Sequence, residues 1–236
     1  PSSPFTGGAI LGDRIRMQKH STDPGVFIRS VAARGWLGGL ARAAISIIHI
    51  MDAMRKDIIL VETVGIGQAE VDITRLADTT LFLLTPTAGD AIQMMKAGIL
   101  EAADIFVINK ADQEGAARLK IELQTMLGMK GHTANEWQPP IVLTEALKSK
   151  GIEELVAEIM KHKEFLAASG GMEKRRKERA RLELVEAIEG SLKDYINTEV
   201  DKAYLEKLVD DLIQKKTNPH SAASAIINRS VKLGRV

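Results

Sequence analysis

The sequence predicts an α/β fold, a doubly wound and mostly parallel sheet, followed by a helical C-terminal arm. Two observations carry this prediction. Between residues 57 and 112, short apolar runs alternate with stretches of helical periodicity, which is the rhythm of βαβ units. After about residue 166 no strand pattern remains, and apolar residues recur at three- and four-residue steps. We therefore expect an α/β domain over residues 1–166 and a helical arm over residues 167–236.

Four apolar runs are expected to form strands of the sheet. Residues 57–62 are apolar between charged ends, residues 80–85 are closed by a proline, and residues 105–108 lead directly into Asn109. A shorter run at residues 141–143 follows two prolines. Because these runs are continuous rather than alternating, we expect strands that are buried on both faces.

Helices are expected between these strands and throughout the C-terminal part. They are predicted over about residues 38–55, over about residues 91–103 and from about Gly151 onward. A linker-like stretch at residues 167–171 separates the two predicted domains. The arm carries two apolar stripes that must be covered, either by a partner surface or by the first domain. The stripes contain Leu182, Val185, Ile188 and Leu192, and Leu205, Leu208, Val209 and Leu212.

Composition excludes several classes of protein. With 32 Lys and Arg against 31 Asp and Glu, the net charge is +1, which excludes a dedicated nucleic-acid binder. The absence of Cys excludes disulfides and thiolate metal sites, and the five His residues lack metal-ligand spacing and are interpreted as structural. No apolar run has membrane-spanning length, so we expect a cytoplasmic protein without a membrane partner. Glutamates interleave the basic cluster at residues 174–181, which we interpret as a solvated helix face.

The strongest chemical signal is the sequence Asn109-Lys110-Ala111-Asp112, which directly follows a predicted strand. Ligand-binding loops of α/β sheets lie at the carboxyl ends of the strands. A carboxylate there can accept two parallel hydrogen bonds from the ring N–H and the exocyclic amine of guanine, a pairing that adenine does not offer. Asp112 would therefore select GTP over ATP, Asn109 would tie neighbouring loops together, and the Lys110 stem would lie along the base. The alternative is a polar turn with a helix cap.

A second polar segment, residues 61–68, follows the run at 57–62 in the same way. It has an acidic residue, Glu62, at the strand end and Gly65 three positions later, as in the Walker-B and switch segments of nucleotide hydrolases. Glu62 could hold a water on Mg²⁺, and the Gly65 backbone N–H could approach a γ-phosphate. The alternative for Glu62 is a strand-end carboxylate in water. Ile66 stands where many GTPases carry a water-orienting Gln, so we expect slow intrinsic hydrolysis.

A phosphate-binding loop of the form G-x-x-x-x-G-K-[ST] does not occur in the sequence. The nearest match, Gly7 to Gly12, is followed by Asp13, whose charge would repel phosphate. We interpret residues 7–14 as a glycine-rich switch loop. The chain begins at Pro1 without an initiator Met, so we expect the first strand of the P-loop NTPase fold and its phosphate loop to lie upstream of it.

With these residues in hand, the chain resembles the P-loop GTPases that act as chaperones of adenosylcobalamin-dependent methylmalonyl-CoA mutase, called MeaB or ArgK in bacteria. The resemblance covers nearly the whole chain. Its matching segments are residues 1–14 (PSSPFTGGAILGDR), 27–30 (FIRS) with 34–41 (RGWLGGLA), 62–68 (ETVGIGQ) and 109–112 (NKAD). The first two segments are long and unusual enough to distinguish this family from other GTPases.

The resemblance implies roles for particular residues. Asp13 falls in the family's switch I, near the γ-phosphate and Mg²⁺, and Glu62, Gly65 and Gln68 fall in switch II. Residues 86–96, which end at Lys96, resemble a third switch that passes the nucleotide state to the mutase. From sequence alone, Lys96 could equally be a surface lysine. Asn109, Lys110 and Asp112 would read guanine. Thr144, Glu145 and Ala146 take the place of the loop whose backbone contacts the guanine oxygen, although they depart from its usual Ser-Ala form.

The family's activity implies a GTP-binding and GTP-hydrolysing chaperone with GTP, GDP and Mg²⁺ as ligands. It would gate adenosylcobalamin delivery to methylmalonyl-CoA mutase, or a related acyl-CoA mutase, and protect that enzyme. The C-terminal helices resemble the family's dimerisation arm, which implies a homodimer.

Two other functions compete with this one. The first is a kinase or ATPase associated with a lysine/arginine/ornithine transport system, a role for which some family members have been named. The second is a non-catalytic binding and dimerisation module. Without the amide cradle and lysine of a phosphate loop, we expect this chain alone to bind nucleotide weakly and to be inactive as a GTPase.

Overall fold

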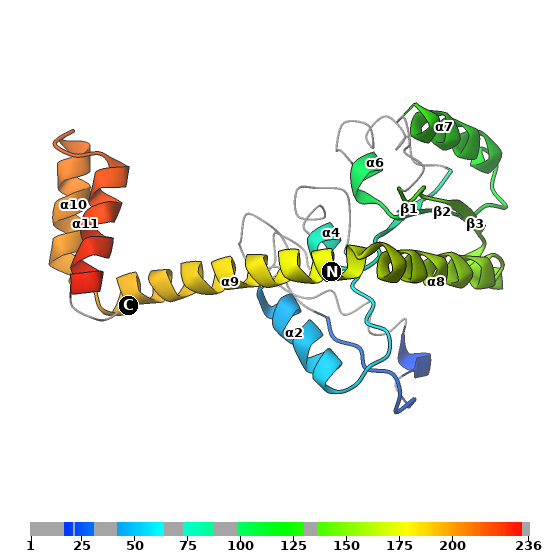
Figure 1. The fold of residues 1–236 in the computed structure, drawn as a ribbon, viewed down its shortest axis with the longest axis horizontal. Coiled ribbons are helices and arrows are strands. Elements are labelled where there is room, and N and C mark those ends of the chain that lie inside the picture. The colour runs from blue at the N-terminus through cyan, green and yellow to red at the C-terminus, as the bar shows by residue number, and fades with distance from the viewer. Residues whose placement is uncertain are drawn as a thin grey trace. The chain divides into compact units, whose positions relative to one another are not determined.

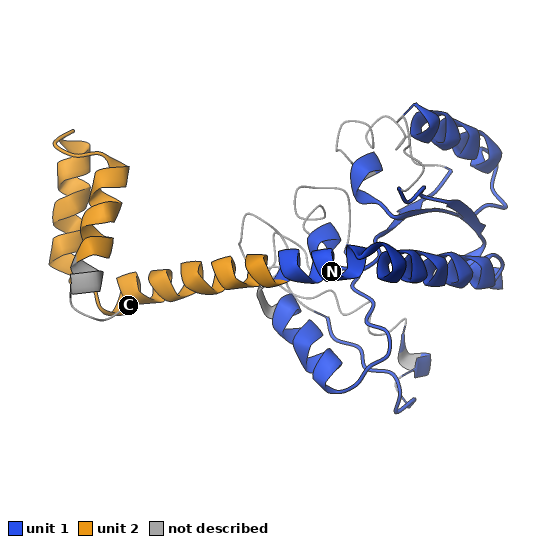
Figure 2. Ribbon diagram, viewed as in Figure 1, with its two compact units in different colours: residues 1–179 blue, residues 180–236 orange. Residues whose placement is uncertain are grey.

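A computed structural model describes residues 17–20, 22–30, 42–63, 73–86, 99–129 and 136–232. The chain divides into two compact units, residues 1–179 and 180–236 (Figure 2). The predicted domain boundary at residues 166/167 stays a prediction. The elements are η1 (Gln18–His20), α2 (Arg42–Ala53), α4 (Ile73–Leu76), β1 (Leu81–Leu84), α6 (Ile99–Ala102), β2 (Ile105–Asn109), α7 (Ala116–Gly128), β3 (Ile141–Thr144), η2 (Ala146–Lys148), α8 (Ile152–Ser169), α9 (Gly171–Thr198), α10 (Lys202–Ile213) and α11 (Pro219–Lys232).

The described strands form a parallel sheet in the order β1-β2-β3. They lie on three of the four predicted runs, and the helical C-terminal part is also present, so the predicted fold class is confirmed. β2 is the middle strand, and its residues Ile105 to Ile108 are at most 2% exposed. The predicted burial on both faces is therefore correct for β2 but wrong for β1, where Leu83 is 63% exposed because β1 is the last strand on its side of the described sheet.

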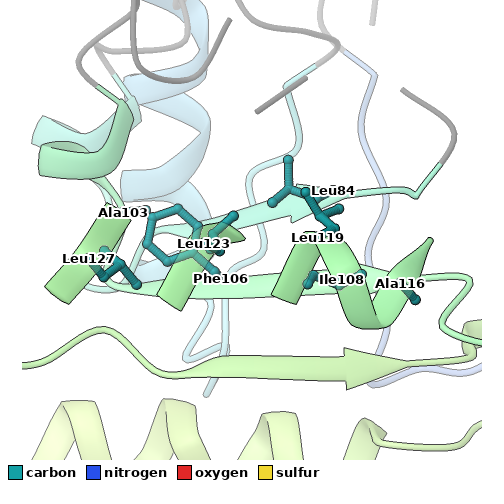
Figure 3. Close-up of a cluster of buried hydrophobic side chains, with 8 residues drawn as sticks. All are labelled: Leu84, Ala103, Phe106, Ile108, Ala116, Leu119, Leu123 and Leu127. Atoms are coloured by element: carbon teal, nitrogen blue, oxygen red, sulfur yellow. The ribbon is translucent and has the colours of Figure 1, made fainter. Parts of the chain in front are cut away.

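Helices α7 and α8 cover opposite faces of the sheet (Figure 1), and the side chains of β2 alternate between two clusters on these faces. Phe106 and Ile108 pack in a cluster with residues of α7, including Leu119 and Leu123 (Figure 3). Ile105 and Val107 lie in a second cluster, against which Leu155 of α8 packs. Burying each of these side chains contributes about 1.5–3 kcal/mol to stability. Because all four belong to β2, this strand is the centre of the hydrophobic core.

Helix α7 was not predicted, although its buried residues Leu119, Leu123 and Leu127 recur at four-residue steps. This spacing places them on one face, which packs on the sheet. Gly115 precedes the helix with φ 95°, a left-handed conformation that favours glycine. The predicted helices at residues 38–55 and 91–103 are described over α2 and α6, and the remainder of each range lies outside the described residues or the helix.

The predicted strand at residues 57–62 is wrong. The structure has no strand there, and Ile58 and Leu60 are 75% and 85% exposed. A strand is stable only when its backbone N–H and C=O groups pair with a neighbour. Within the described part of the chain the sheet ends at β1, and residues 57–62 pair with none of its strands. An apolar pattern in the sequence does not show whether a neighbouring strand is there to pair with it.

The N-terminal end of the sheet holds the start of α9 through a buried carboxylate, Asp104. Its oxygens accept from Arg175, at 2.7 and 3.1 Å, and from the backbone N–H of Thr80 at 2.8 Å. Arg175 also donates to the backbone carbonyl of Asp78, and Arg179 pairs with the Asp78 carboxylate. The basic cluster is thus not wholly a solvated face, because two of its arginines bind the sheet end.

His162 on α8 lies beside this carboxylate and is 1% exposed. Its Nδ1 is 2.9 Å from the Thr79 hydroxyl, and its Nε2 is 3.3 Å from an oxygen of Asp104. Trp137 packs against the imidazole, with ring centroids 4.7 Å apart and ring planes tilted by 53°, and its indole N–H donates to the Asp104 carbonyl. These contacts agree with the interpretation of this His as structural.

In the second unit, α10 begins at a side-chain cap: the Asp201 carboxylate accepts from the Ala203 N–H at 2.7 Å. Large apolar side chains remain exposed on the helices of this unit. Among the described helices, none combines the length and the apolar character that crossing a membrane requires.

Gly151 is predicted to be indispensable to the turn between β3 and α8. Its φ is 72°, and a Cβ there would lie 2.1 Å from the Leu143 carbonyl oxygen. We expect Gly151→Ala to lower the free energy of unfolding by at least about 2 kcal/mol. Gly170→Ala is the matched control, because Gly170 has φ 73° but nothing within 4 Å of its Cβ position. The control should cost only about 1 kcal/mol. Equal costs in urea denaturation would contradict the steric argument.

Stability is predicted to depend on pH through His162. Burial lowers the pKa of His162, Arg175 adds to this, and Asp104 opposes it. Near pH 6.5 the unfolded chain therefore binds a proton at His162 that the folded chain does not bind. The contribution of the neutral His162 to the free energy of unfolding is present above about pH 6.5 and is lost as the pH drops toward the folded-state pKa. The slope is at most about 1.4 kcal/mol per pH unit. Urea denaturation between pH 5.5 and 7.5 should show this slope in the wild type and a flatter profile in His162→Gln.

Candidate functional site

The candidate site lies where β2 and β3 end, at the same edge of the sheet. Because the strands are parallel, Asn109 at the end of β2 pairs in register with Thr144 at the end of β3. The two loops that follow, residues 110–115 and 145–151, are therefore neighbours although they lie more than thirty positions apart in the sequence. Sheets of this class bind ligands at this edge.

The Asn109 side chain joins the two loops. Its Oδ1 accepts from the Thr144 hydroxyl at 3.2 Å and from the Ala146 backbone N–H at 3.1 Å. Thr144 is 3% exposed, so this contact reaches into the buried end of β3. The Ala146 N–H belongs to the loop whose backbone the family resemblance places against the guanine oxygen, and in this structure it donates to Asn109.

Lys110 has an unusual backbone conformation, with φ 57°. A non-glycine residue in this left-handed region is uncommon and costs about 1–2 kcal/mol, and such residues occur often at binding sites. The conformation is held on both sides. The Ala111 N–H donates to the Thr144 carbonyl at 3.0 Å, and the Gln113 N–H donates to the Lys110 carbonyl at 3.0 Å. The Lys110 side chain is left exposed at the rim of the site.

Asp112 and Glu145 are bridged by one ammonium group. The Lys148 Nζ is 3.0 Å from Asp112 Oδ2 and 2.8 Å from Glu145 Oε2. Lys150 binds the other oxygen of Glu145 at 3.0 Å. The hydrogen bond from Lys148 lowers the pKa of Asp112, and Lys148 and Lys150 together lower the pKa of Glu145. In turn, Glu145 and Asp112 raise the pKa of Lys148. Asp112, Glu145 and Lys148 are therefore charged at neutral pH.

The turn that carries Lys148 is closed by backbone hydrogen bonds. The Glu145 and Lys150 backbones exchange N–H to carbonyl bonds at 3.1 and 3.3 Å. Ser149 has φ 57° between them, and Gly151 follows with φ 72° at a point where no side chain fits against β3. The position of the Lys148 backbone is thus set by the turn and the end of β3.

The other predicted site residues are largely beyond the described part of the chain. Asp13, Gly65, Gln68 and Lys96 lie outside the described residues, so the structure gives no position for them. Glu62 is described: its side chain is exposed, at the end of the segment that was wrongly predicted as a strand. Among the described residues, no three His, Asp or Glu side chains form a group that could hold a metal ion.

Lys148 contacts two predicted site residues but was not itself predicted from the sequence. The signal was the mixture of charges at Glu145, Lys148 and Lys150, which includes an i,i+3 pair of opposite sign. The sequence does not reveal that Asp112 lies within reach, because that contact spans 36 positions and exists only when β2 and β3 pair.

Comparison with known sequences identifies the family. The chain matches the family described as "Methylmalonyl Co-A mutase-associated GTPase MeaB" over residues 1–201. It is 47% identical over 233 residues to a protein of Pyrococcus abyssi named as a GTPase, a match that covers 98% of this chain and 72% of that protein. It is also 34% identical over 214 residues to GTPase ArgK of Escherichia coli, covering 89% of this chain and 65% of that protein.

A solved structure shares the fold. The crystal structure of an LAO/AO transport system kinase superposes with a TM-score of 0.56 at 25% sequence identity, covering 78% of this chain and 61% of that chain. The chain thus spans less than two thirds of that kinase and of the E. coli relative.

Proposed function

Because the chain belongs to the family of methylmalonyl-CoA mutase-associated GTPases, we propose that residues 109–112 and 144–146 bind the guanine base of GTP and GDP. The observation that carries the proposal is the joining of these two segments at the carboxyl end of the sheet, through Asn109. Family membership supports guanine-nucleotide binding. The choice of residues 109–112 and 144–146 as the guanine site rests on the hydrogen-bonding groups that these segments present.

Each residue has a separate role in this proposal. The Asp112 carboxylate accepts from the two N–H donors of guanine, which selects guanine over adenine. Asn109 holds the two loops at a constant distance, and the aliphatic stem of Lys110 covers one face of the base. Thr144 and Glu145 position the Ala146 N–H toward the guanine oxygen. For this, the Ala146 N–H must be shared with or released by Asn109.

We assign Mg²⁺ and the phosphates to the other predicted residues. Asp13 and Glu62 would hold Mg²⁺, Glu62 through a water, and Gly65, Gln68 and Lys96 would respond to the γ-phosphate. Exposed carboxylate oxygens are the donors that Mg²⁺ prefers, and Glu62 provides one. The metal would neutralise phosphate charge during hydrolysis. With Ile66 in place of a water-orienting Gln, hydrolysis is expected to be slow until a partner supplies the missing group.

The whole protein is proposed to act as a cytoplasmic chaperone that gates adenosylcobalamin delivery to methylmalonyl-CoA mutase or a related mutase. The family description, which names a mutase association, supports this role. We further propose a homodimer formed through the helices of the second unit. Its support is the set of large apolar side chains that are exposed on these helices: Leu184 (61%), Val185 (47%), Ile188 (58%), Val209 (46%), Ile213 (74%) and Ile227 (44%).

The second candidate function is a kinase or ATPase of a lysine/arginine/ornithine transport system. The observation in its favour is the shared fold with a structure titled as a transport system kinase. The two functions differ in the base they require. A kinase that uses ATP has no need of a carboxylate at residue 112, so the preference for GTP or ATP separates them.

Asp112→Asn is predicted to abolish selection of guanine. The amide of Asn presents a donor to one of the two N–H groups of guanine, so GDP affinity should fall by at least about tenfold while ATP binding is unchanged. Xanthosine diphosphate, which has a carbonyl in place of the amine, should bind the variant better than GDP. Calorimetry with GDP, xanthosine diphosphate and ATP measures all three. The control is Glu114→Gln, an exposed carboxylate of the same loop. Unchanged selectivity in Asp112→Asn would refute the guanine assignment.

Val185→Lys with Ile188→Glu is predicted to dissociate the proposed homodimer, because charges replace apolar side chains on one face of α9. Sedimentation velocity of the wild type should show a dimer and that of the variant a monomer. Ile121→Glu is the control, since Ile121 on α7 is 63% exposed in the other unit. The proposed partner is tested separately, by assaying whether the wild-type dimer retains purified methylmalonyl-CoA mutase. Monomeric wild-type protein would exclude the proposed interface.

A further inference from the structure

We propose that Lys148 determines the nucleotide affinity of the guanine site by competing with the base for Asp112: its ammonium binds both Asp112 and Glu145, and it releases Asp112 but keeps Glu145 when the base enters. The inference rests on the proposed function, since it assumes that Asp112 reads guanine. It assigns a role to a residue that no sequence motif indicates. It also accounts for the departure of residues 144–146 from the usual Ser-Ala form.

The first support is the placement of the Lys148 ammonium between two carboxylates. It lies 3.0 Å from Asp112 Oδ2 and 2.8 Å from Glu145 Oε2. The two carboxylates differ in exposure: the Glu145 side chain is 16% exposed and that of Asp112 is 46% exposed. Glu145 is thus the sheltered partner and Asp112 is the one that faces solvent and an incoming ligand.

The second support is that the turn places this cation at the site. Lys148 is carried on the turn that the backbone bonds between Glu145 and Lys150 close, and that turn is attached to the end of β3. The Asp112 loop is attached to the end of β2, which pairs with β3. Lys148 and Asp112 therefore meet as a result of the sheet register and not only of side-chain flexibility.

The third support is the chemistry of the base. Guanine offers two adjacent N–H donors, and both oxygens of Asp112 must be available to accept them in parallel. An ammonium on Oδ2 is a competing donor that carries a full charge. An ammonium has three donors, so Lys148 can release Asp112 and keep its contact with Glu145. Glu145 therefore retains the cation within the site when the base binds.

Two substitutions should change affinity in opposite directions. Lys148→Met removes the competitor and should tighten guanosine and GDP binding by about two- to fivefold, because exposed ion pairs are weak. Glu145→Gln removes the alternative carboxylate, leaves Lys148 on Asp112, and should weaken binding by a similar factor. Lys150→Met is the matched control, because Lys150 binds Glu145 at 3.0 Å without contacting Asp112. It should bind like the wild type.

The measurement is NMR titration of the whole chain with guanosine and GDP, with adenosine as the reference ligand. Guanosine has no phosphates, so its binding reports on the base site alone. In the same samples, the carboxyl resonance of Asp112 should titrate at a higher pH in Lys148→Met than in the wild type, because the ion pair is lost. A turn whose role is only structural would instead weaken binding in both variants.

The outcomes separate the inference from the proposed function. If guanosine perturbs no resonance of residues 109–112 or 144–146 in any variant, the guanine site itself is refuted, and the inference with it. If guanosine binds but Lys148→Met binds it equally or more weakly, only the competition is refuted. An unchanged titration of Asp112 in Lys148→Met would refute the ion pair on which the inference depends.

Discussion

The pairing of β2 with β1 on one side and β3 on the other is the constraint on which the rest of the first unit depends. It buries four consecutive apolar residues of β2 between α7 and α8. The same pairing sets the register that brings Asn109 opposite Thr144. Because the strands run parallel, their N-terminal ends lie together beside the hydrogen-bond network of Asp104, and their carboxyl ends lie together at the candidate site.

The two edges use charged side chains in different ways. At the N-terminal edge, Asp104 is 8% exposed and its oxygens accept from an arginine and a backbone N–H, so removing a partner would leave a buried charge uncompensated. At the carboxyl edge, the charges of Asp112 and Lys148 are about half exposed, and water can replace either partner at little cost. The first arrangement suits a permanent attachment of α9, and the second suits a contact that a ligand can replace.

The segment at residues 57–62 shows the limit of arguments from hydrophobicity. Its apolar pattern resembles that of β2, yet Ile58 and Leu60 are exposed while Ile105 and Val107 are buried. The difference lies in hydrogen bonding between strands, because β2 has a neighbour on each side and residues 57–62 pair with no strand of the described sheet. An apolar run indicates a tendency to be buried, and a neighbouring strand decides whether that burial is achieved.

Apolar runs and short polar motifs are local patterns, so the fold class and three of the four predicted strands could be derived from the sequence, and the guanine motif could be proposed from it. Comparison of long segments such as residues 1–14 was also sufficient to indicate the family. Three features are visible only in the folded chain: Arg175 binds Asp104, residues 57–62 pair with no strand of the described sheet, and Lys148 binds Asp112. Each of these depends on residues far apart in the chain, which come within bonding distance only through the parallel pairing of the strands and the packing of helices on them.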